Sequence, residues 1–254
     1  VAGDGPAVVL LHSGVCDRRM WDPQWTALAA AGYRVIRPDL RGFGLSPVAD
    51  RPYSDADDVA VLLRTLGVGR AVLVGSSYGG RVALELAGSR PELVTALALL
   101  CPAVPGQVPG PELRSFGGRE DALLAAGDVE GAVELNVETF LGPEAGDDVR
   151  ERVRAMQRRA FEVQLAAVEE FPQTRPEADL ARITAPCLAV SGAHDLPDFR
   201  EIAARLPEQL SQARHVELPW AGHLPSLERP AEVTEVLLDF LRVTAPSARA
   251  NISH

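Results

Sequence analysis

The sequence contains no lysine, because all 25 of its basic residues are arginine. This absence excludes a Schiff-base lysine, and with it pyridoxal phosphate chemistry and the serine–lysine form of nucleophile activation. Acidic residues number 35, so the formal net charge is −10. Because an acidic surface repels phosphate backbones and anionic lipid headgroups, the sequence predicts no nucleic-acid partner and no membrane contact.

Cysteine is also scarce, with three widely spaced residues, Cys16, Cys101 and Cys187. An odd number without a C-x-x-C pair favours neither a disulfide framework nor a zinc site. It fits a reducing compartment, so we predict a cytoplasmic protein. Cys101 and Cys187 lie in apolar runs and are expected in the core. Cys16 lies in a loop near the candidate site, where a reactive thiol is the alternative.

Other signatures are missing as well. No apolar run reaches the length of a membrane span, and no signal-peptide pattern opens the chain. Gly42-Phe43-Gly44 lacks the third glycine and the following helix of a dinucleotide-binding loop. No Cys/His cluster has the spacing of metal ligands. The sequence therefore predicts no metal and no cofactor.

The chain does contain short apolar runs that alternate with helical patterns. Its 254 residues, 46% of them apolar, suit one domain. Strands buried on both faces have continuous apolar runs, and helical spacers between them imply right-handed crossovers. We therefore predict an α/β fold with a doubly wound, mostly parallel sheet. The expected strands are 7–11, 33–36, 71–74, 93–100, 188–190 and 215–218, and the expected helices are 23–31, 54–66, 78–88 and 231–242.

One stretch breaks the alternation. Residues 104–183 show no strand pattern, only Pro/Gly-rich chain and helical patterns at 122–141 and 148–171. We therefore expect a core made of residues 1–103 and 184–254, with a helical lid inserted at 104–183. Such an insertion would cover the carboxyl ends of the strands, where open α/β sheets bind ligands. The alternative is an ordinary surface excursion.

The segment Gly75-Ser76-Ser77-Tyr78-Gly79 matches the pattern G-x-S-x-G between an expected strand and an expected helix. The serine of such a turn has a strained backbone, and side chains two residues to either side would collide, which Gly75 and Gly79 avoid. The following helix presents N–H groups and a dipole that stabilise negative charge. We predict Ser77 as a nucleophile, since Ser76 lacks glycines at the right offsets.

A serine hydroxyl needs a base to take its proton, and five histidines are available. His223 lies between the last expected strand and the last expected helix, at the sheet edge where Ser77 also lies. We therefore predict that His223 is the base, with His194 as the alternative. The other histidines are less suitable by position: His12, His215 and His254.

The acid is expected between nucleophile and base in the chain, on a loop after a strand. Asp195 closely follows the expected strand 188–190. We predict that it accepts the Nδ1 proton of His223, fixes the tautomer and stabilises the imidazolium. Asp198 is the alternative, but it follows Pro197 and is expected to begin a helix, where a carboxylate has a capping or dipole role.

Acyl transfer also needs hydrogen-bond donors for a developing oxyanion. We predict the N–H of Tyr78, directly after the nucleophile, and that of Gly14, in the loop after the first strand. Val15 is the alternative to Gly14. Apolar substrate contacts are expected from a further set of residues, which fit the core equally well: Val15, Trp21, Phe140, Met156 and Trp220.

Together these residues resemble the α/β-hydrolase superfamily over nearly the whole chain. Four motifs carry the resemblance: the oxyanion turn 12–14, with Ser13 where glycine is commoner, the D-x-R-G-x-G-x-S loop 39–46, the acid turn 192–195, and the histidine loop 222–225 with 228–230. Residues 18–22 and the short lid resemble small esterases and 3-oxoadipate enol-lactonases. The family usually has two strands before the one at 7–11, so we expect either a shortened chain or a sheet without that edge.

The resemblance implies a serine hydrolase that cleaves a small carboxylic ester or lactone through an acyl-enzyme on Ser77. Serine at the nucleophile position argues against haloalkane dehalogenase and epoxide hydrolase activity. A C–C bond hydrolase, a perhydrolase or a lyase would use the same residues, and a ligand-binding receptor that retains the triad is the alternative from another class. The expected partner is a small-molecule substrate, and no oligomeric state is predicted.

Overall fold

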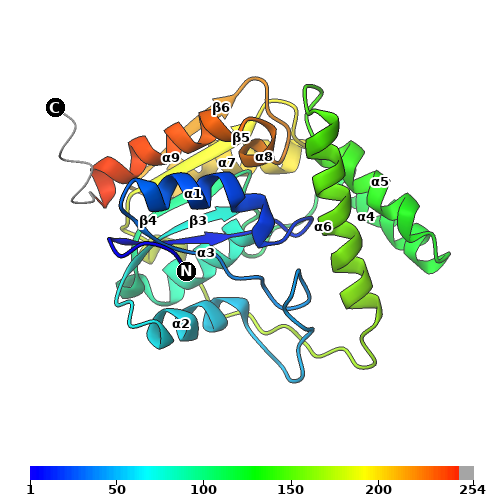
Figure 1. Cartoon of the computed structure of the whole chain (residues 1–254), viewed down its shortest axis with the longest axis horizontal. Coiled ribbons are helices and arrows are strands. Elements are labelled where there is room, and N and C mark those ends of the chain that lie inside the picture. Colours follow the sequence, from blue (N-terminus) through cyan, green and yellow to red (C-terminus); the bar gives the residue numbers. More distant parts are fainter. Residues whose placement is uncertain (246–254) are drawn as a thin grey trace.

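The computed structural model describes residues 1–245, and its centre is one parallel sheet (Figure 1). The strand order is β2-β1-β3-β4-β5-β6, and each neighbouring pair is parallel. The predicted doubly wound sheet is confirmed, and each expected strand overlaps an observed one. The strands are β1 (Ala7–Leu11), β2 (Arg34–Ile36), β3 (Ala71–Ser76), β4 (Val94–Leu100), β5 (Cys187–Gly192) and β6 (Ala213–Leu218).

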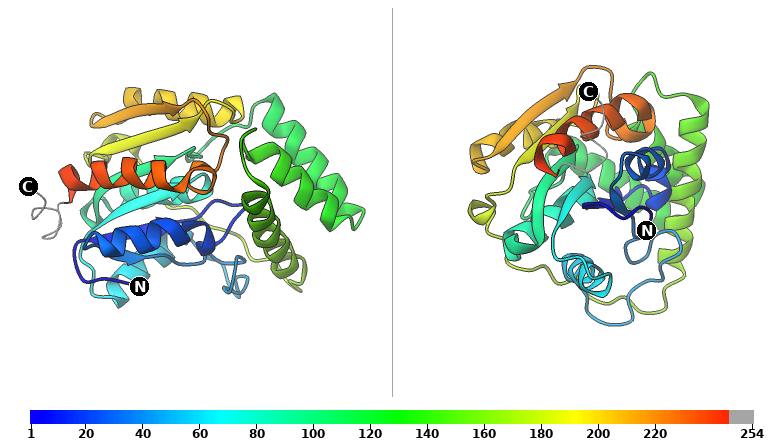
Figure 2. Two further views of the ribbon diagram at one scale, coloured as in Figure 1. Left: turned by 45° about the horizontal axis from the view of Figure 1, so that its top comes forward. Right: turned by 60° about the vertical axis from the view of Figure 1, so that its left-hand side comes forward.

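Helices cover both faces of this sheet (Figures 1 and 2). In β1, Val8 and Leu10 pack into the core under α1 and α9, whereas Val9 and Leu11 pack into the core under α2, α3 and α7. This two-sided burial explains why the strands have continuous apolar runs. The covering helices are α1 (Asp22–Ala30) and α9 (Pro230–Thr244) on one face, with α2 (Asp55–Thr65), α3 (Tyr78–Ser89) and α7 (Pro197–Gln209) on the other.

Shorter helical turns complete the core: η1 (Arg18–Trp21), η2 (Pro91–Leu93), η3 (Leu180–Arg182) and α8 (Pro225–Glu228). At the outer edge of β2, Ala2 and Val35 form an antiparallel bridge, with N···O distances of 3.0 and 2.7 Å. This bridge adds one antiparallel contact to β2, which is an edge strand of the sheet. Among residues 1–245, no helix is both long and apolar enough to cross a membrane.

Between β4 and β5 the chain forms a helical insertion, whose helices are α4 (Pro111–Ala125), α5 (Val129–Phe140) and α6 (Asp147–Leu165). The single helix expected at 122–141 is wrong. Gly127, with φ 75°, ends the preceding helix, and the Asp128 side chain caps α5 by accepting the Gly131 N–H (2.8 Å). Helix α6 also ends earlier than the expected residue 171.

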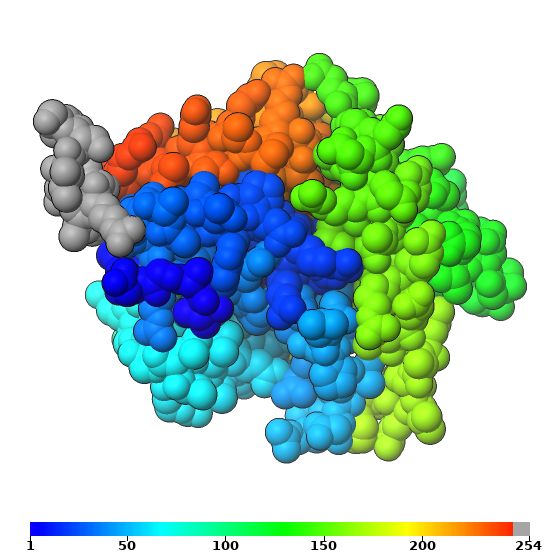
Figure 3. All heavy atoms as spheres, in the orientation of Figure 1, coloured from blue at the N-terminus to red at the C-terminus, as the bar shows by residue number. Residues whose placement is uncertain are grey.

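The insertion lies at one end of the sheet, as Figures 1 and 2 show. Its helix α6 packs against the loop after β2, because Arg159 and Gln164 donate to the carbonyls of Gly44 (3.1 Å) and Gly42 (3.2 Å). Figure 3 shows the loop after β2 and the helical insertion side by side at the molecular surface. Since loops that follow parallel strands leave at the carboxyl edge, the insertion begins at that end of the sheet.

Candidate active site

Ser77 forms the turn between β3 and α3, and its backbone has φ 51° and ψ −114°. A non-glycine residue in such a conformation stores strain of about 1–3 kcal/mol. Hydrogen bonds hold the turn: the Ser77 N–H donates to the Leu100 carbonyl (2.9 Å), and the Ser77 carbonyl accepts from Gly80 (2.9 Å) and Ala103 (3.1 Å). The side chain stands where a strand-to-helix elbow presents a nucleophile, and the residue is 8% exposed.

Gly75 and Gly79 leave no room for side chains. A Cβ on Gly75 would lie 2.4 Å from the carbonyl oxygen of Gly79, and a Cβ on Gly79 would lie 2.3 Å from that of Leu11. Helix α3 therefore packs against β1 and β3 with backbone touching backbone. The collisions that the sequence pattern predicts at these two glycines are confirmed.

His223 lies in the loop between β6 and α8, and Asp195 lies in the loop between β5 and α7. Nδ1 of His223 is 2.7 Å from Oδ2 of Asp195, and the two side chains are 1% and 0% exposed. Since an ionised carboxylate can only accept, Nδ1 carries the proton and Nε2 of the neutral ring is a proton acceptor. The rings of Phe140 and Phe199 flank the imidazole, with centroids 4.8 and 4.1 Å away.

The sheet brings the elbow and the histidine–aspartate pair to one edge. Strands β3, β4 and β5 are parallel neighbours, so the residues that follow them emerge at the same end. The N–H of Cys101, just after β4, donates to the Val190 carbonyl of β5 (2.7 Å). A Cβ on Gly192 would lie 2.0 Å from the Gly222 carbonyl oxygen, so the acid loop and the histidine loop also touch through their backbones.

Cys101 lies beside the pair and, as expected, is completely buried. Its Sγ is 3.6 Å from the Gly222 carbonyl and lies within 4.8 Å of ligand atoms of Asp195 and His223. Such a cluster could hold a metal only with the thiolate form. However, burial and, secondly, the charge of Asp195 raise the pKa of the Cys101 thiol far above its ordinary value. We therefore interpret the thiol as a protonated neighbour of the acid.

The alternative residues from the sequence lie in other settings. His215 shares a hydrogen bond with Ser191 (2.8 Å), and burial lowers its pKa. His194 is exposed, and His254 lies outside the described residues. Cys16 is completely buried, and burial raises the pKa of its thiol well above the ordinary value, which argues against a reactive thiol. Of the described residues among these, none approaches the geometry of His223 with Asp195.

His12 has a structural role next to the oxyanion loop. Its Nε2 accepts the N–H of Leu40 (2.9 Å), so Nδ1 carries the proton and donates to the Ser13 carbonyl (2.8 Å). Burial lowers the pKa of this completely buried ring. The neutral imidazole therefore joins the loop after β1 to the loop after β2.

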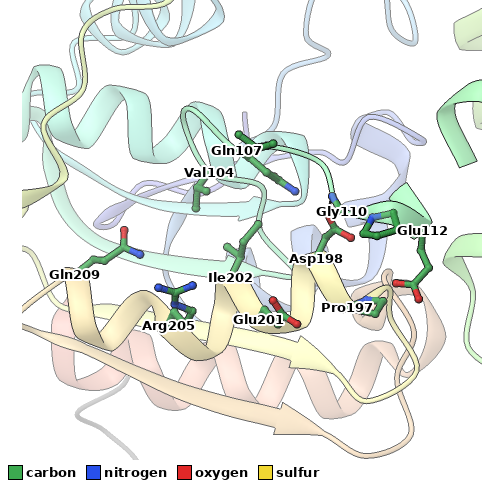
Figure 4. A pocket seen from close by; sticks show the side chains of 12 residues that line it. Val104, Gln107, Gly110, Glu112, Pro197, Asp198, Glu201, Ile202, Arg205 and Gln209 are labelled. Atoms are coloured by element: carbon green, nitrogen blue, oxygen red, sulfur yellow. Dashed lines mark hydrogen bonds between the residues drawn. The ribbon is translucent and has the colours of Figure 1, made fainter. Parts of the chain in front are cut away.

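Asp198 stands in the first turn of α7, as expected, but its carboxylate is occupied elsewhere. Oδ1 of Asp198 accepts the N–H of Gly110, at the start of the insertion. Figure 4 shows this pair in a cavity of about 370 Å³ between the segment 104–112 and α7, where Glu201 and Arg205 also point. Of the two candidate aspartates, Asp195 contacts His223, whereas Asp198 anchors the insertion.

The two predicted oxyanion donors lie side by side. Tyr78 is the first residue of α3, where N–H groups have no partner within the helix. A Cβ on Gly14 would lie 3.6 Å from the Cβ of Tyr78, which places the loop after β1 against the start of α3. The N–H of Val15, the alternative donor, makes a long contact with the Ser13 hydroxyl (3.5 Å).

The predicted substrate contacts all belong to one apolar cluster or pack against it. Phe140 packs on the His223 ring, and Met156 and Val15 are buried in the same apolar cluster as Phe140. Trp21 is 0% exposed within the core, and Trp220 is partly buried under the guanidinium of Arg229, 4.7 Å from its ring centroid. For both tryptophans the geometry favours a packing role, the alternative that the sequence left open.

Comparisons with known proteins agree with this geometry. A family model described as "Alpha/beta hydrolase family" matches residues 8–236. The chain belongs to this family. A protein named carbamate hydrolase RutD from Variovorax paradoxus is 34% identical over 97% of this chain and 96% of its own length.

Two further relatives of this α/β hydrolase are named for other activities. A pimeloyl-[acyl-carrier protein] methyl ester esterase from Aeromonas hydrophila is 32% identical, over 94% of this chain and 96% of the relative. The crystal structure of an enol-lactonase from Burkholderia xenovorans is 27% identical with a TM-score of 0.75, and the match covers 94% of this chain and 92% of that one. The esterase and the enol-lactonase among these relatives confirm the predicted resemblance to that branch of the family.

Two side chains that touch the histidine loop escaped prediction from the sequence. Cys101 was expected only as a core residue, although it directly follows β4 at the edge of the candidate site. Glu228 was noted only as part of a motif, yet its carboxylate accepts backbone hydrogen bonds on both sides of His223. The signal for Glu228 was an acidic residue in an otherwise buried segment, from Pro225 to Leu227.

Proposed function

We propose that this α/β hydrolase cleaves a small carboxylic ester or lactone through an acyl-enzyme on Ser77. The observation that carries the proposal is the buried 2.7 Å hydrogen bond between His223 and Asp195 at the sheet edge that also presents the Ser77 elbow. A histidine whose tautomer a carboxylate fixes, at the same sheet edge as a strained serine, fits the arrangement that nucleophilic acyl transfer requires.

Each side chain has one role in this reaction. Nε2 of His223 takes the proton of the Ser77 hydroxyl while the oxygen attacks the acyl carbon, and Asp195 stabilises the imidazolium that forms. The N–H groups of Tyr78 and Gly14 hold the oxyanion of the tetrahedral intermediate. The imidazolium then protonates the leaving alkoxide, and a water activated by His223 hydrolyses the acyl-enzyme and restores the serine.

The walls of the site favour an apolar group near the scissile bond. The rings of Phe140 and Phe199 lie tilted against the imidazole, and Phe116 meets Phe140 edge to face, with centroids 4.9 Å apart. Phe116 and Phe140 belong to α4 and α5, so the insertion supplies part of this surface and acts as the proposed lid over residues 104–183. Aromatic walls bind acyl or alkyl chains better than charged groups.

The activities for which the relatives are named share one chemistry, because a carbamate, a methyl ester and an enol-lactone each present a carbonyl carbon to a nucleophile. We favour esters and lactones because their leaving group is an alkoxide that His223 can protonate directly. C–C hydrolysis, perhydrolysis and lyase reactions, or a receptor role, remain the competing hypotheses.

The test combines labelling with a substrate panel. A fluorophosphonate should modify Ser77, as peptide mass mapping would show, and the protein should hydrolyse p-nitrophenyl acetate and butyrate, γ- and δ-lactones, or both. A carbamate series and a peracid assay in the same experiment separate the competing reactions. Labelling of a different serine, or binding of all these compounds without turnover, would contradict the proposal.

A further inference from the structure

The carboxylate of Glu228, at the end of α8, holds the loop of His223 through hydrogen bonds to its backbone. Its Oε1 accepts the N–H groups of Gly222 (3.1 Å) and Leu224 (3.2 Å), which lie on either side of His223. Its Oε2 accepts the N–H of Gly222 (3.0 Å) and that of Gly142 (3.2 Å), just after α5 in the insertion. One carboxylate therefore bridges the histidine loop and the insertion.

No guanidinium neutralises this carboxylate within the described residues. Arg229, its neighbour in the chain, pairs instead with Glu144 and Glu232. Burial raises the pKa of Glu228, while the backbone N–H groups of Gly222, Leu224 and Gly142 and the charge of a protonated His223 act in the opposite direction. Partial burial of a carboxylate costs free energy of solvation. Here only hydrogen bonds from peptide N–H groups offset that cost, so the carboxylate and those groups hold each other in place.

The peptide groups around Glu228 are packed too closely for side chains. A Cβ on Gly142 would lie 2.7 Å from the Gly222 nitrogen, and a Cβ on Gly222 would lie 2.3 Å from the Gly142 nitrogen. The N–H of His223 itself donates to the Phe140 carbonyl, at 2.9 Å. Thus the three consecutive amides 222–224 are all bonded, and each bond leads to Glu228 or to the insertion.

We propose that Glu228 is a positioning residue for His223, and that it fixes the histidine loop to the end of α5 as one unit. The inference rests on the proposed function, because it assumes that His223 is the base. Asp195 orients the imidazole through Nδ1, but the ring can meet the serine only if its own backbone is held. A shift of about 1 Å in a reacting group costs about 100-fold in rate.

The test compares Glu228→Gln with the matched control Glu232→Gln, a neighbouring exposed glutamate that pairs with Arg229. The amide of Glu228→Gln puts an NH₂ against backbone donors, so we expect kcat to fall by about 10- to 100-fold per fluorophosphonate-labelled site, with KM changed less than about threefold. Glu232→Gln should leave both constants within twofold of wild type.

A spectroscopic readout separates positioning from mere loss of stability. The Nδ1 proton that His223 shares with Asp195 should give a downfield proton NMR signal, assigned by its absence in Asp195→Ala. We expect this signal to move or broaden in Glu228→Gln and to stay in place in Glu232→Gln. If Glu228→Gln does not fold, Glu228→Asp keeps the charge but shortens its reach, and it should show the same changes more weakly.

Two results would overturn the inference: wild-type kcat per labelled site in folded Glu228→Gln, or an unchanged Nδ1 proton signal in that variant. Failure of the proposed function looks different. In that case the wild-type protein would neither turn over the substrate panel nor react at Ser77, while the NMR comparison would still report whether Glu228 holds the His223–Asp195 pair.

Discussion

The turn that carries Ser77 and the loop that carries His223 lie at the same edge of the sheet, but different parts of the chain hold them. Strand β3, the turn and α3 are contiguous, and the other backbone contacts of the turn are to the adjacent strands β1 and β4, through Leu11 and Leu100. The loop of His223 instead depends on Asp195 after β5 and on Phe140 in the insertion.

This difference predicts how the two regions respond to change. A turn held by its own stretch and by the adjacent central strands of the sheet keeps its geometry when residues of the insertion are altered. A loop held by remote partners moves when any of them moves, and loops open locally more easily than packed strands and helices. We therefore expect changes in the insertion to shift His223, and so to slow proton transfer, more than they alter the backbone of the Ser77 turn.

The largest expected effect comes from the nucleophile. Ser77→Ala should lower kcat by about 10⁶-fold, as removal of a triad nucleophile does in other serine hydrolases. Ser76→Ala is the matched control, since Ser76 is completely buried in β3 and its hydroxyl makes no hydrogen bond within residues 1–245. It should keep wild-type kcat. Steady-state kinetics of both variants decide between the two serines, and a reversed pattern would contradict the elbow assignment.

The second-largest expected effect concerns the loop of His223, which distant parts of the chain hold. Asp195→Asn should keep the fold but favour the wrong tautomer of His223, so kcat should fall by up to about 10⁴-fold. Asp198→Asn should leave kcat within a few-fold and cost about 1 kcal/mol in the free energy of unfolding, because it weakens the bond to the Gly110 N–H. Kinetics and urea unfolding of both variants test this, and a collapse of kcat in Asp198→Asn alone would reverse the assignment.

Sequence predicted the elbow well because its signals are local. Glycines at fixed offsets, a preceding apolar strand and a following helix all lie within residues 71–89. The same reasoning failed for α4, which has no buried residue to set an apolar periodicity and whose helix formers are interrupted by Gly117 and Gly118.

The supports of the histidine loop were out of reach for a different reason. The bond from Gly142 to Glu228 joins residues 86 positions apart, and no local pattern marks either partner. Position in the chain was enough to select His223 and Asp195, because both follow sheet strands. What holds their loops depends on where the insertion packs, which periodicity does not report.

A third prediction concerns His12, in the loop after β1 near the Ser77 turn, and the pH dependence of the free energy of unfolding. The folded-state pKa of His12 is lowered by burial, so the unfolded chain takes up a proton that the folded chain excludes. The free energy of unfolding should therefore fall as the pH drops below the ordinary histidine value of 6.5, by up to about 1.4 kcal/mol per pH unit.

His12→Asn should reduce this slope, as measured by urea unfolding at pH 7.5 and 5.5. The exposed His194→Asn is the control and should keep the wild-type slope. The contribution of His215, whose pKa is also lowered by burial, is common to all these proteins and cancels in the comparison. An unchanged slope in His12→Asn would show that the oxyanion loop does not depend on a neutral imidazole.

The smallest effect separates the backbone of Tyr78 from its side chain. The Tyr78 hydroxyl donates to the buried carboxylate of Asp55, which also accepts from Gln173 (2.7 Å). Tyr78→Phe removes one of the two donors to Asp55, so the free energy of unfolding should fall by about 1 kcal/mol. Since the proposed oxyanion donor is the backbone N–H, kcat should stay within about twofold. A double-mutant cycle with Asp55→Asn should show coupling in stability and none in kcat. If turnover instead slowed about 100-fold without loss of stability, the phenol itself would take part in the reaction, and the turn would then depend on more than its own backbone.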